Sequence, residues 1–85
     1  MLGRKAPPRV RVRFKVERAN EITEARGLLR IQDKAAFFGT SPSSYSRVIN
    51  GVAKPGEDFI AAVLASQPGD PDITFESLFE VVTAA

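Results

Sequence analysis

The side chains best suited to chemistry in this sequence are polar and cationic groups gathered between residues 41 and 54. Four serines, one arginine, one asparagine and one lysine stand there, at Ser41, Ser43, Ser44, Ser46, Arg47, Asn50 and Lys54. Serine donates and accepts hydrogen bonds, and the arginine fork and the asparagine amide can each bind a partner through two hydrogen bonds at once. The chemistry that this group suits is recognition of a polar surface.

Catalysis has little support in the composition. The chain of 85 residues contains no histidine and no cysteine, so it lacks the side chain that most easily moves protons near neutral pH and the strongest nucleophile. Its ten acidic residues are scattered, and none pairs by spacing at a common site. The sequence therefore predicts a protein that is not an enzyme, with no cofactor, no metal site and no small-molecule ligand.

The net charge of +2 hides a steep asymmetry along the chain. Residues 1–54 hold all 12 Lys and Arg and four of the ten acids, a net charge of +8. Residues 55–85 hold six acids and no base, a net charge of −6. The first part suits a polyanion, and we expect the second part to face away from it. A solvated surface with uneven charge is the alternative reading.

The first 15 residues are predicted to form a basic arm and a strand. Residues 1–9 contain one glycine, two prolines and three cations, a composition typical of a flexible arm. From Val10 to Val16 apolar residues alternate strictly with Arg and Lys, which is strand periodicity. With no second strand of comparable quality, this strand either packs on the helices as an extended arm or pairs with a copy of itself in a dimer. Its cationic face either contacts DNA or is a solvated edge.

Residues 16–85 are predicted to form an all-α domain of five helices. Apolar residues recur there at three- and four-residue steps, with Gly and Pro between the runs. The helices are expected near residues 17–29, 32–38, 42–50, 57–66 and 75–82. Leu29 and Ala36 are expected on inner faces. The last stripe of Phe75, Leu78, Phe79 and Val82 is expected to serve the core or a dimer interface.

Two of these helices meet in a tight turn. Gly39 allows the turn, Ser41 can cap the next helix, and Pro42 suits its first position. This is the geometry of a helix-turn-helix, in which the second helix lies in the major groove of DNA. Its outward side chains are small, polar or cationic, although serine is a poor helix former. A solvated helix in another α-bundle is the alternative interpretation.

A set of residues around this turn has a familiar spacing: Ala35, Gly39, Ser41, Tyr45, Ser46, Arg47, Val48, Gly51 and Pro55. With this spacing the motif resembles the helix-turn-helix of the lambda-type repressor and Cro family. The tail from Phe59 to Phe79 is similar to the last two helices of actinobacterial and actinophage members. Four residues depart from the family pattern. Lys34 stands where a core leucine is usual, and Tyr45 stands where a small aliphatic residue is usual. The hydroxyl of Tyr45 must therefore find water or another hydrogen-bond partner. Pro42 and Ser43 replace the long amides often found at the front of the reading helix.

The resemblance implies a transcription regulator, of phage or prophage repressor or Cro type, that binds an operator in double-stranded DNA as a homodimer. The expected place is the bacterial cytoplasm, at the nucleoid, with no membrane contact. The predicted DNA-binding residues are Arg9, Arg11, Arg13, Gln32, Ser41, Pro42, Ser43, Ser44, Ser46, Arg47, Asn50 and Lys54. The alternative function is a small helical module that binds a host protein rather than an operator.

Overall fold

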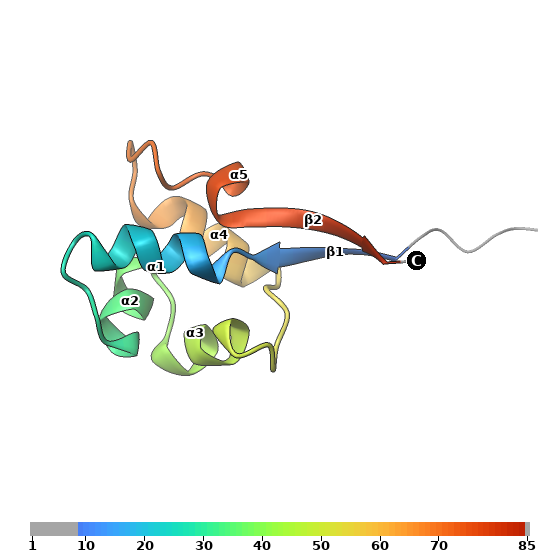
Figure 1. Cartoon of the computed structure of the whole chain (residues 1–85), viewed down its shortest axis with the longest axis horizontal. Coiled ribbons are helices and arrows are strands. Elements are labelled where there is room, and N and C mark those ends of the chain that lie inside the picture. Colours follow the sequence, from blue (N-terminus) through green and yellow to red (C-terminus); the bar gives the residue numbers. More distant parts are fainter. Residues whose placement is uncertain (1–8, 85) are drawn as a thin grey trace, which may run out of the picture.

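An antiparallel pair of strands joins the two ends of the chain in the computed structural model, which describes residues 9–84 (Figure 1). Strand β1 (Arg9–Phe14) pairs with β2 (Phe79–Ala84), with Phe14 opposite Phe79 and Val12 opposite Val81. Five helices lie between the strands: α1 (Val16–Glu24), α2 (Ile31–Phe37), α3 (Pro42–Ile49), α4 (Glu57–Ser66) and α5 (Phe75–Leu78). The two-stranded ribbon extends away from the helices on one side (Figure 1).

The predicted all-α class is therefore wrong, because the last predicted helix stops after one turn. Helix α5 begins as expected, with the Thr74 side chain accepting a hydrogen bond from the Ser77 N–H at 3.1 Å. At Phe79 the backbone becomes extended (φ −132°, ψ 157°), and β2 follows. The β-branched residues Val81, Val82 and Thr83 favour an extended chain, and β1 satisfies the backbone groups that a helix would otherwise have satisfied.

The predicted strand is present, but its partner is neither of the two that the sequence suggested. The strand pairs with β2 of the same chain. It neither packs alone on the helices nor needs a second copy of the protein as its partner. It is also shorter than expected, because Val16 begins α1. Lys15 makes the corner: its N–H donates to the Leu78 carbonyl at 2.7 Å and its carbonyl accepts from Ala19 at 2.9 Å. The arm predicted for residues 1–8 lies outside the described residues.

Aromatic side chains from nearly every element meet in the core, with Phe14 at the centre. The Phe14 ring lies 5.2–6.0 Å from four other rings, those of Phe38, Tyr45, Phe59 and Phe79. These contacts join β1 to α2, α3, α4 and β2, so the strand is part of the core. Leu29 and Ala36 were expected inside and are instead exposed, because α1 ends before Leu29 and α2 turns Lys34 inward in place of Ala36.

Lys34 is buried and is held by two polar side chains of α1. Its ammonium group donates to the Glu24 carboxylate at 2.8 Å and to the side-chain amide oxygen Oδ1 of Asn20 at 3.0 Å. Only 6 % of the Lys34 side chain is exposed, against 49 % for Glu24. The charge at the position where the resemblance leads one to expect leucine is therefore compensated inside the domain, and it ties α2 to α1.

The different exposure of these two partners predicts an asymmetric response to mutation. Glu24→Ala leaves a buried ammonium with only the Asn20 amide and should lower the free energy of unfolding by about 1–2 kcal/mol. Lys34→Met replaces the ammonium with an apolar chain and leaves a half-exposed carboxylate in water, so the change should stay within about 1 kcal/mol of zero. Urea unfolding measures both. An equal loss in the two variants would contradict the argument.

Candidate nucleic-acid interface

The turn between α2 and α3 is formed by backbone hydrogen bonds that require a glycine. Gly39 has φ +73°, a conformation that other residues rarely adopt. Its N–H donates to the Ala36 carbonyl at 3.1 Å, and the next N–H, of Thr40, donates to the Ala35 carbonyl at 2.9 Å. These two bonds are those of a Schellman motif, which ends α2 and directs the chain into α3. The predicted turn is confirmed.

Helix α3 begins as the sequence predicted. The Ser41 side chain accepts a hydrogen bond from the Ser44 N–H at 3.1 Å, and Pro42 occupies the first turn. The helix ends at Ile49 and is followed by Gly51 at φ +74°. The Gly51 N–H donates to Val48 and the Val52 N–H donates to Arg47, so a second Schellman motif closes this end. Both ends of the short helix are thus defined by local interactions.

Tyr45 anchors α3 to the rest of the domain. Its side chain is fully buried and its ring stacks on that of Phe38, with ring centres 5.8 Å apart and planes at 18°. Val48 and Ile49 are half-buried beside it. Because this side of α3 is packed, the opposite side is held outward in a fixed orientation.

The outward side of α3 holds most of the predicted contact residues. Ser43, Ser44, Arg47 and Asn50 are exposed, as are Ser41 and Pro42 at the start. Ser46 is half-buried, and its hydroxyl accepts a hydrogen bond from the Asn50 amide at 3.2 Å. These side chains offer donors and acceptors on one surface, as reading of base edges requires.

The cations of the described residues fall into two groups. Four of them bind carboxylates: Arg13, Arg18, Arg26 and Lys34. Their partners include Asp70, Asp72 and Glu80, so the acidic last part of the chain neutralises cations of β1 and α1. Five others have no carboxylate partner within residues 9–84: Lys15, whose ammonium group donates to the Glu76 backbone carbonyl at 2.9 Å, and Arg11, Arg30, Arg47 and Lys54.

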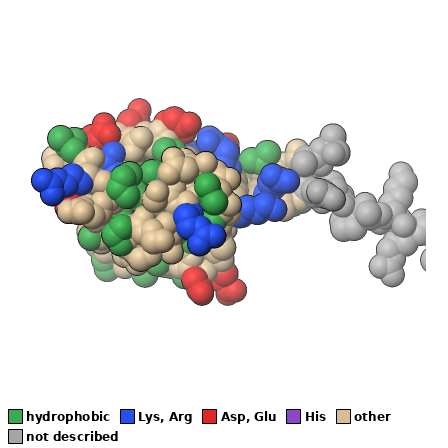
Figure 2. All heavy atoms as spheres, turned by 90° about the horizontal axis from the view of Figure 1, so that it is seen from below, with side chains coloured by type: hydrophobic (Ala, Val, Ile, Leu, Met, Phe, Trp, Pro, Cys, Tyr) green, Lys and Arg blue, Asp and Glu red, His purple; other side chains and the backbone are tan. Residues whose placement is uncertain are grey.

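Three of the cations without such partners lie on or beside the helix-turn-helix. Arg47 is on α3, Lys54 follows it, and Arg30 immediately precedes α2. Figure 2 views the molecule from the side of α2 and α3: Lys and Arg are spread across this face, and Asp and Glu lie along its upper and lower margins. A surface of this kind attracts a polyanion.

The predicted DNA-binding residues of the strand differ in whether they form ion pairs. Arg11 is exposed and carries no ion pair to a described residue, whereas Arg13 binds Glu80 and Glu17, and its hydrogen bond to Glu80 raises its pKa. Arg9 begins β1, and only its backbone is described. Gln32 is exposed in the first turn of α2. Sequence reasoning missed Arg30, although a cation directly before Ile31 and Gln32 at a helix start was a usable signal.

Residues 9–84 contain neither a metal-binding cluster nor a helix that could span a membrane. No group of three or more His, Cys, Asp or Glu side chains there is placed to hold a metal ion. None of the described helices has the length and apolar character that crossing a membrane requires. The interface therefore rests on its own geometry, since no protein-family model, no curated protein and no solved structure matches the chain.

Proposed function

We propose that this protein is a sequence-specific DNA-binding transcriptional regulator that places α3 in the major groove of double-stranded DNA. The observation that carries the proposal is the outer side of α3, where Ser43, Ser44, Arg47 and Asn50 are exposed on a helix whose other side is packed through Tyr45. Arginine and asparagine bind guanine and adenine through paired hydrogen bonds, and serine binds several base edges.

The electrostatics support the same orientation on DNA. Arg30, Arg47, Lys54 and Arg11 can each contact phosphate, since no described carboxylate competes for them. In this proposal the protein acts on nucleoid DNA in the bacterial cytoplasm, as a repressor or Cro-type regulator of a phage or prophage. That setting rests on the resemblance of the motif.

The proposal includes a homodimer, because operators read by a helix-turn-helix consist of two half-sites related by symmetry. The outer edge of β2 suits this contact. Val81 and Val82 are 59 % and 38 % exposed, and β2 contains no cation to repel a second copy. Sedimentation equilibrium measures the association directly.

Selection of bound fragments from sheared genomic DNA, at rising salt, tests the function. A sequence-specific regulator retains a few fragments after the others are released, because base contacts survive when phosphate contacts weaken. A module that binds a protein instead retains no preferred fragment at any salt concentration, and this outcome would refute the proposal.

Replacing Arg47 tests how α3 reads DNA. Arg47→Ala should weaken operator binding by about 1–3 kcal/mol and relax the requirement for one base, while the melting transition is unchanged because the side chain is exposed. The matched control is Arg30→Ala, which removes the same charge beside α2 and should weaken operator and random DNA equally. An equal loss on both DNAs for Arg47→Ala would show that it contacts phosphate only.

A further inference from the structure

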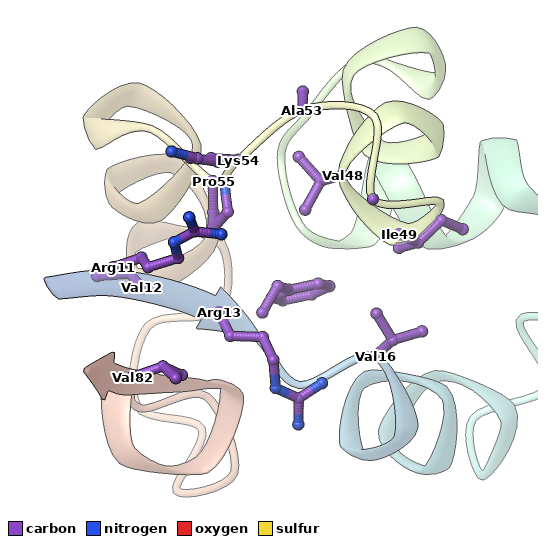
Figure 3. Close-up of a pocket in the computed structure, with 12 residues that line it drawn as sticks. Arg11, Val12, Arg13, Val16, Val48, Ile49, Ala53, Lys54, Pro55 and Val82 are labelled. Carbon is purple, nitrogen blue, oxygen red and sulfur yellow. The ribbon is translucent and has the colours of Figure 1, made fainter. Parts of the chain in front are cut away.

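A groove runs between the outer edge of β1 and the loop that joins α3 to α4 (Figure 3). It encloses about 420 Å³. Its walls come from β1 on one side, from the end of α3 and the following loop on the other, and from Val16 and Val82. The groove is distinct from the outward side of α3, because its lining does not include Arg47, Asn50 or the serines of that helix.

The edge of β1 that faces this groove has backbone groups with no other strand of residues 9–84 beside them. The Lys15 N–H donates to the Leu78 carbonyl, which makes this pair a hydrogen-bonded one. In an antiparallel ladder, hydrogen-bonded pairs alternate with non-hydrogen-bonded ones. The pairs of Arg13 with Glu80 and of Arg11 with Val82 are therefore also hydrogen-bonded pairs. The N–H and C=O groups of Val10 and Val12 therefore point away from β2. They are available to another strand.

The side chains of the groove combine an apolar floor with positive charge. Val12, Val16, Val48 and Ile49 are half-buried, so each still has apolar surface to cover. The lining contains three cations, Arg11, Arg13 and Lys54, and no carboxylate. In Figure 3 the guanidinium of Arg11 lies toward Lys54 and Pro55, whereas that of Arg13 points away from this loop. Arg11 and Lys54 thus place two like charges at one end of the groove, where a carboxylate would reduce their repulsion.

We propose that this groove binds an extended, acidic peptide segment of a partner protein, which adds to β1 as a third strand. The backbone edge of β1 supplies hydrogen bonds, and the alternation of side chains along a strand supplies specificity. Aliphatic side chains of every second residue cover the apolar floor, and acidic side chains between them meet Arg11 and Lys54.

Two other occupants fit the groove less well. A second copy of β1 would bring Arg11 and Arg13 close to the same cations of its partner, and like charges on paired strands are destabilising. A DNA backbone offers phosphate to Arg11 and Lys54 but has no aliphatic group for the floor formed by Val12, Val48 and Ile49. An acidic strand matches both the charge and the apolar surface.

Peptide binding would also compete with DNA, because Arg11 and Lys54 belong to both surfaces. This consequence rests on the proposed function, whereas the peptide site itself does not. A partner with such a segment would then release the protein from an operator by occupying these two cations and by adding negative charge beside α3.

The test uses the full chain without DNA and a fluorescent peptide of seven residues in which glutamate and valine alternate. Fluorescence anisotropy should show saturable binding, and Arg11→Gln and Lys54→Gln should each weaken it by about 2- to 5-fold, the range of exposed ion pairs. The matched control is Arg30→Gln, which removes a cation outside the groove and should leave binding unchanged. A peptide of equal charge with proline at its centre should bind about tenfold more weakly, since it loses a ladder hydrogen bond.

Amide hydrogen exchange distinguishes strand addition from simple attraction between charges. The Val10 and Val12 amides should exchange more slowly when the peptide is bound, whereas those of Arg11 and Arg13 already bond to β2 and should change little. Binding without protection of Val10 and Val12, or an equal effect of Arg30→Gln, would overturn the proposal. Failure of the peptide to bind would overturn it as well, and would leave the DNA-binding proposal to its own test.

Discussion

Gly39→Val should lower the free energy of unfolding by about 3 kcal/mol, which thermal or urea unfolding measures. Gly39 has φ +73°, and a side chain in this region costs about 1–3 kcal/mol, with β-branched residues the least tolerated. A Cβ atom would also lie 3.3 Å from the Ala62 carbonyl oxygen and 3.6 Å from Ser66 Cβ, both on α4. Strain and close contact therefore add in the same direction. An unchanged melting transition would contradict the turn described at this position.

Gly51→Val separates these two causes. Gly51 has nearly the same backbone conformation, φ +74°, but a Cβ atom there would meet nothing within 4 Å. The substitution should therefore show backbone strain alone, about 1–2 kcal/mol. The difference between the two variants measures how closely the α2–α3 turn approaches α4. If Gly51→Val proved as costly as Gly39→Val, the contact with Ala62 would have no energetic role.

The protein should lose about 2–3 kcal/mol of stability as the pH rises from 10 to 12, because Tyr45 cannot ionise easily inside the core. Burial raises the pKa of Tyr45 to about 12 from an ordinary value of 10, and the nearby Glu24 carboxylate adds to the shift. Below pH 10 the phenol is protonated in both states, so this contribution is fully present. Between pH 10 and 12 only the unfolded chain releases the proton, so unfolding becomes more favourable as the pH rises.

Tyr45 is the only tyrosine of the chain and there is no tryptophan, so phenolate absorbance reports this residue alone. The folded protein should titrate well above pH 10, and the unfolded protein in denaturant near pH 10. The control is Tyr45→Phe, which should remove the difference in pH dependence that this residue causes. A folded-state titration near pH 10 would show that the hydroxyl reaches solvent.

The same variant tests the cost of the buried hydroxyl. The Tyr45 oxygen has no hydrogen-bond partner among the described residues, although the side chain is fully buried. The sequence predicts that this group must find water or a partner, and none of the described residues provides a partner. Tyr45→Phe should therefore raise the free energy of unfolding at neutral pH by about 1 kcal/mol, since an unsatisfied buried polar group is lost without leaving a cavity.

The sequence alone was sufficient for several features that depend on residues close together in the chain. The α2–α3 turn is formed within six residues, by Gly39 and the backbone groups of Ala35 and Ala36. The caps at Ser41 and Thr74 each bond an N–H three residues on, and α4 occupies the range that its apolar pattern predicted. The candidate interface could be predicted for the same reason, because the outward side of a short helix follows from its buried residues.

Only the tertiary structure decided the ends of the chain and the state of its charges. The spacing of Phe75, Leu78, Phe79 and Val82 is compatible with a helix. The chain nevertheless forms β2 from Phe79 onward, because β1, more than 60 residues earlier, supplies its hydrogen bonds. A strand depends on such a distant partner, whereas a helix satisfies its own backbone.

The charges follow the same logic. No spacing along the chain reveals that Arg13 binds Glu80, that Lys34 is buried against Glu24, or that Arg47 has no carboxylate near it among the described residues. An ion pair forms between side chains that the fold brings within about 4 Å, whatever their separation in sequence. The sequence therefore determined which residues could bind a polyanion, and the fold decided which of their charges remained available.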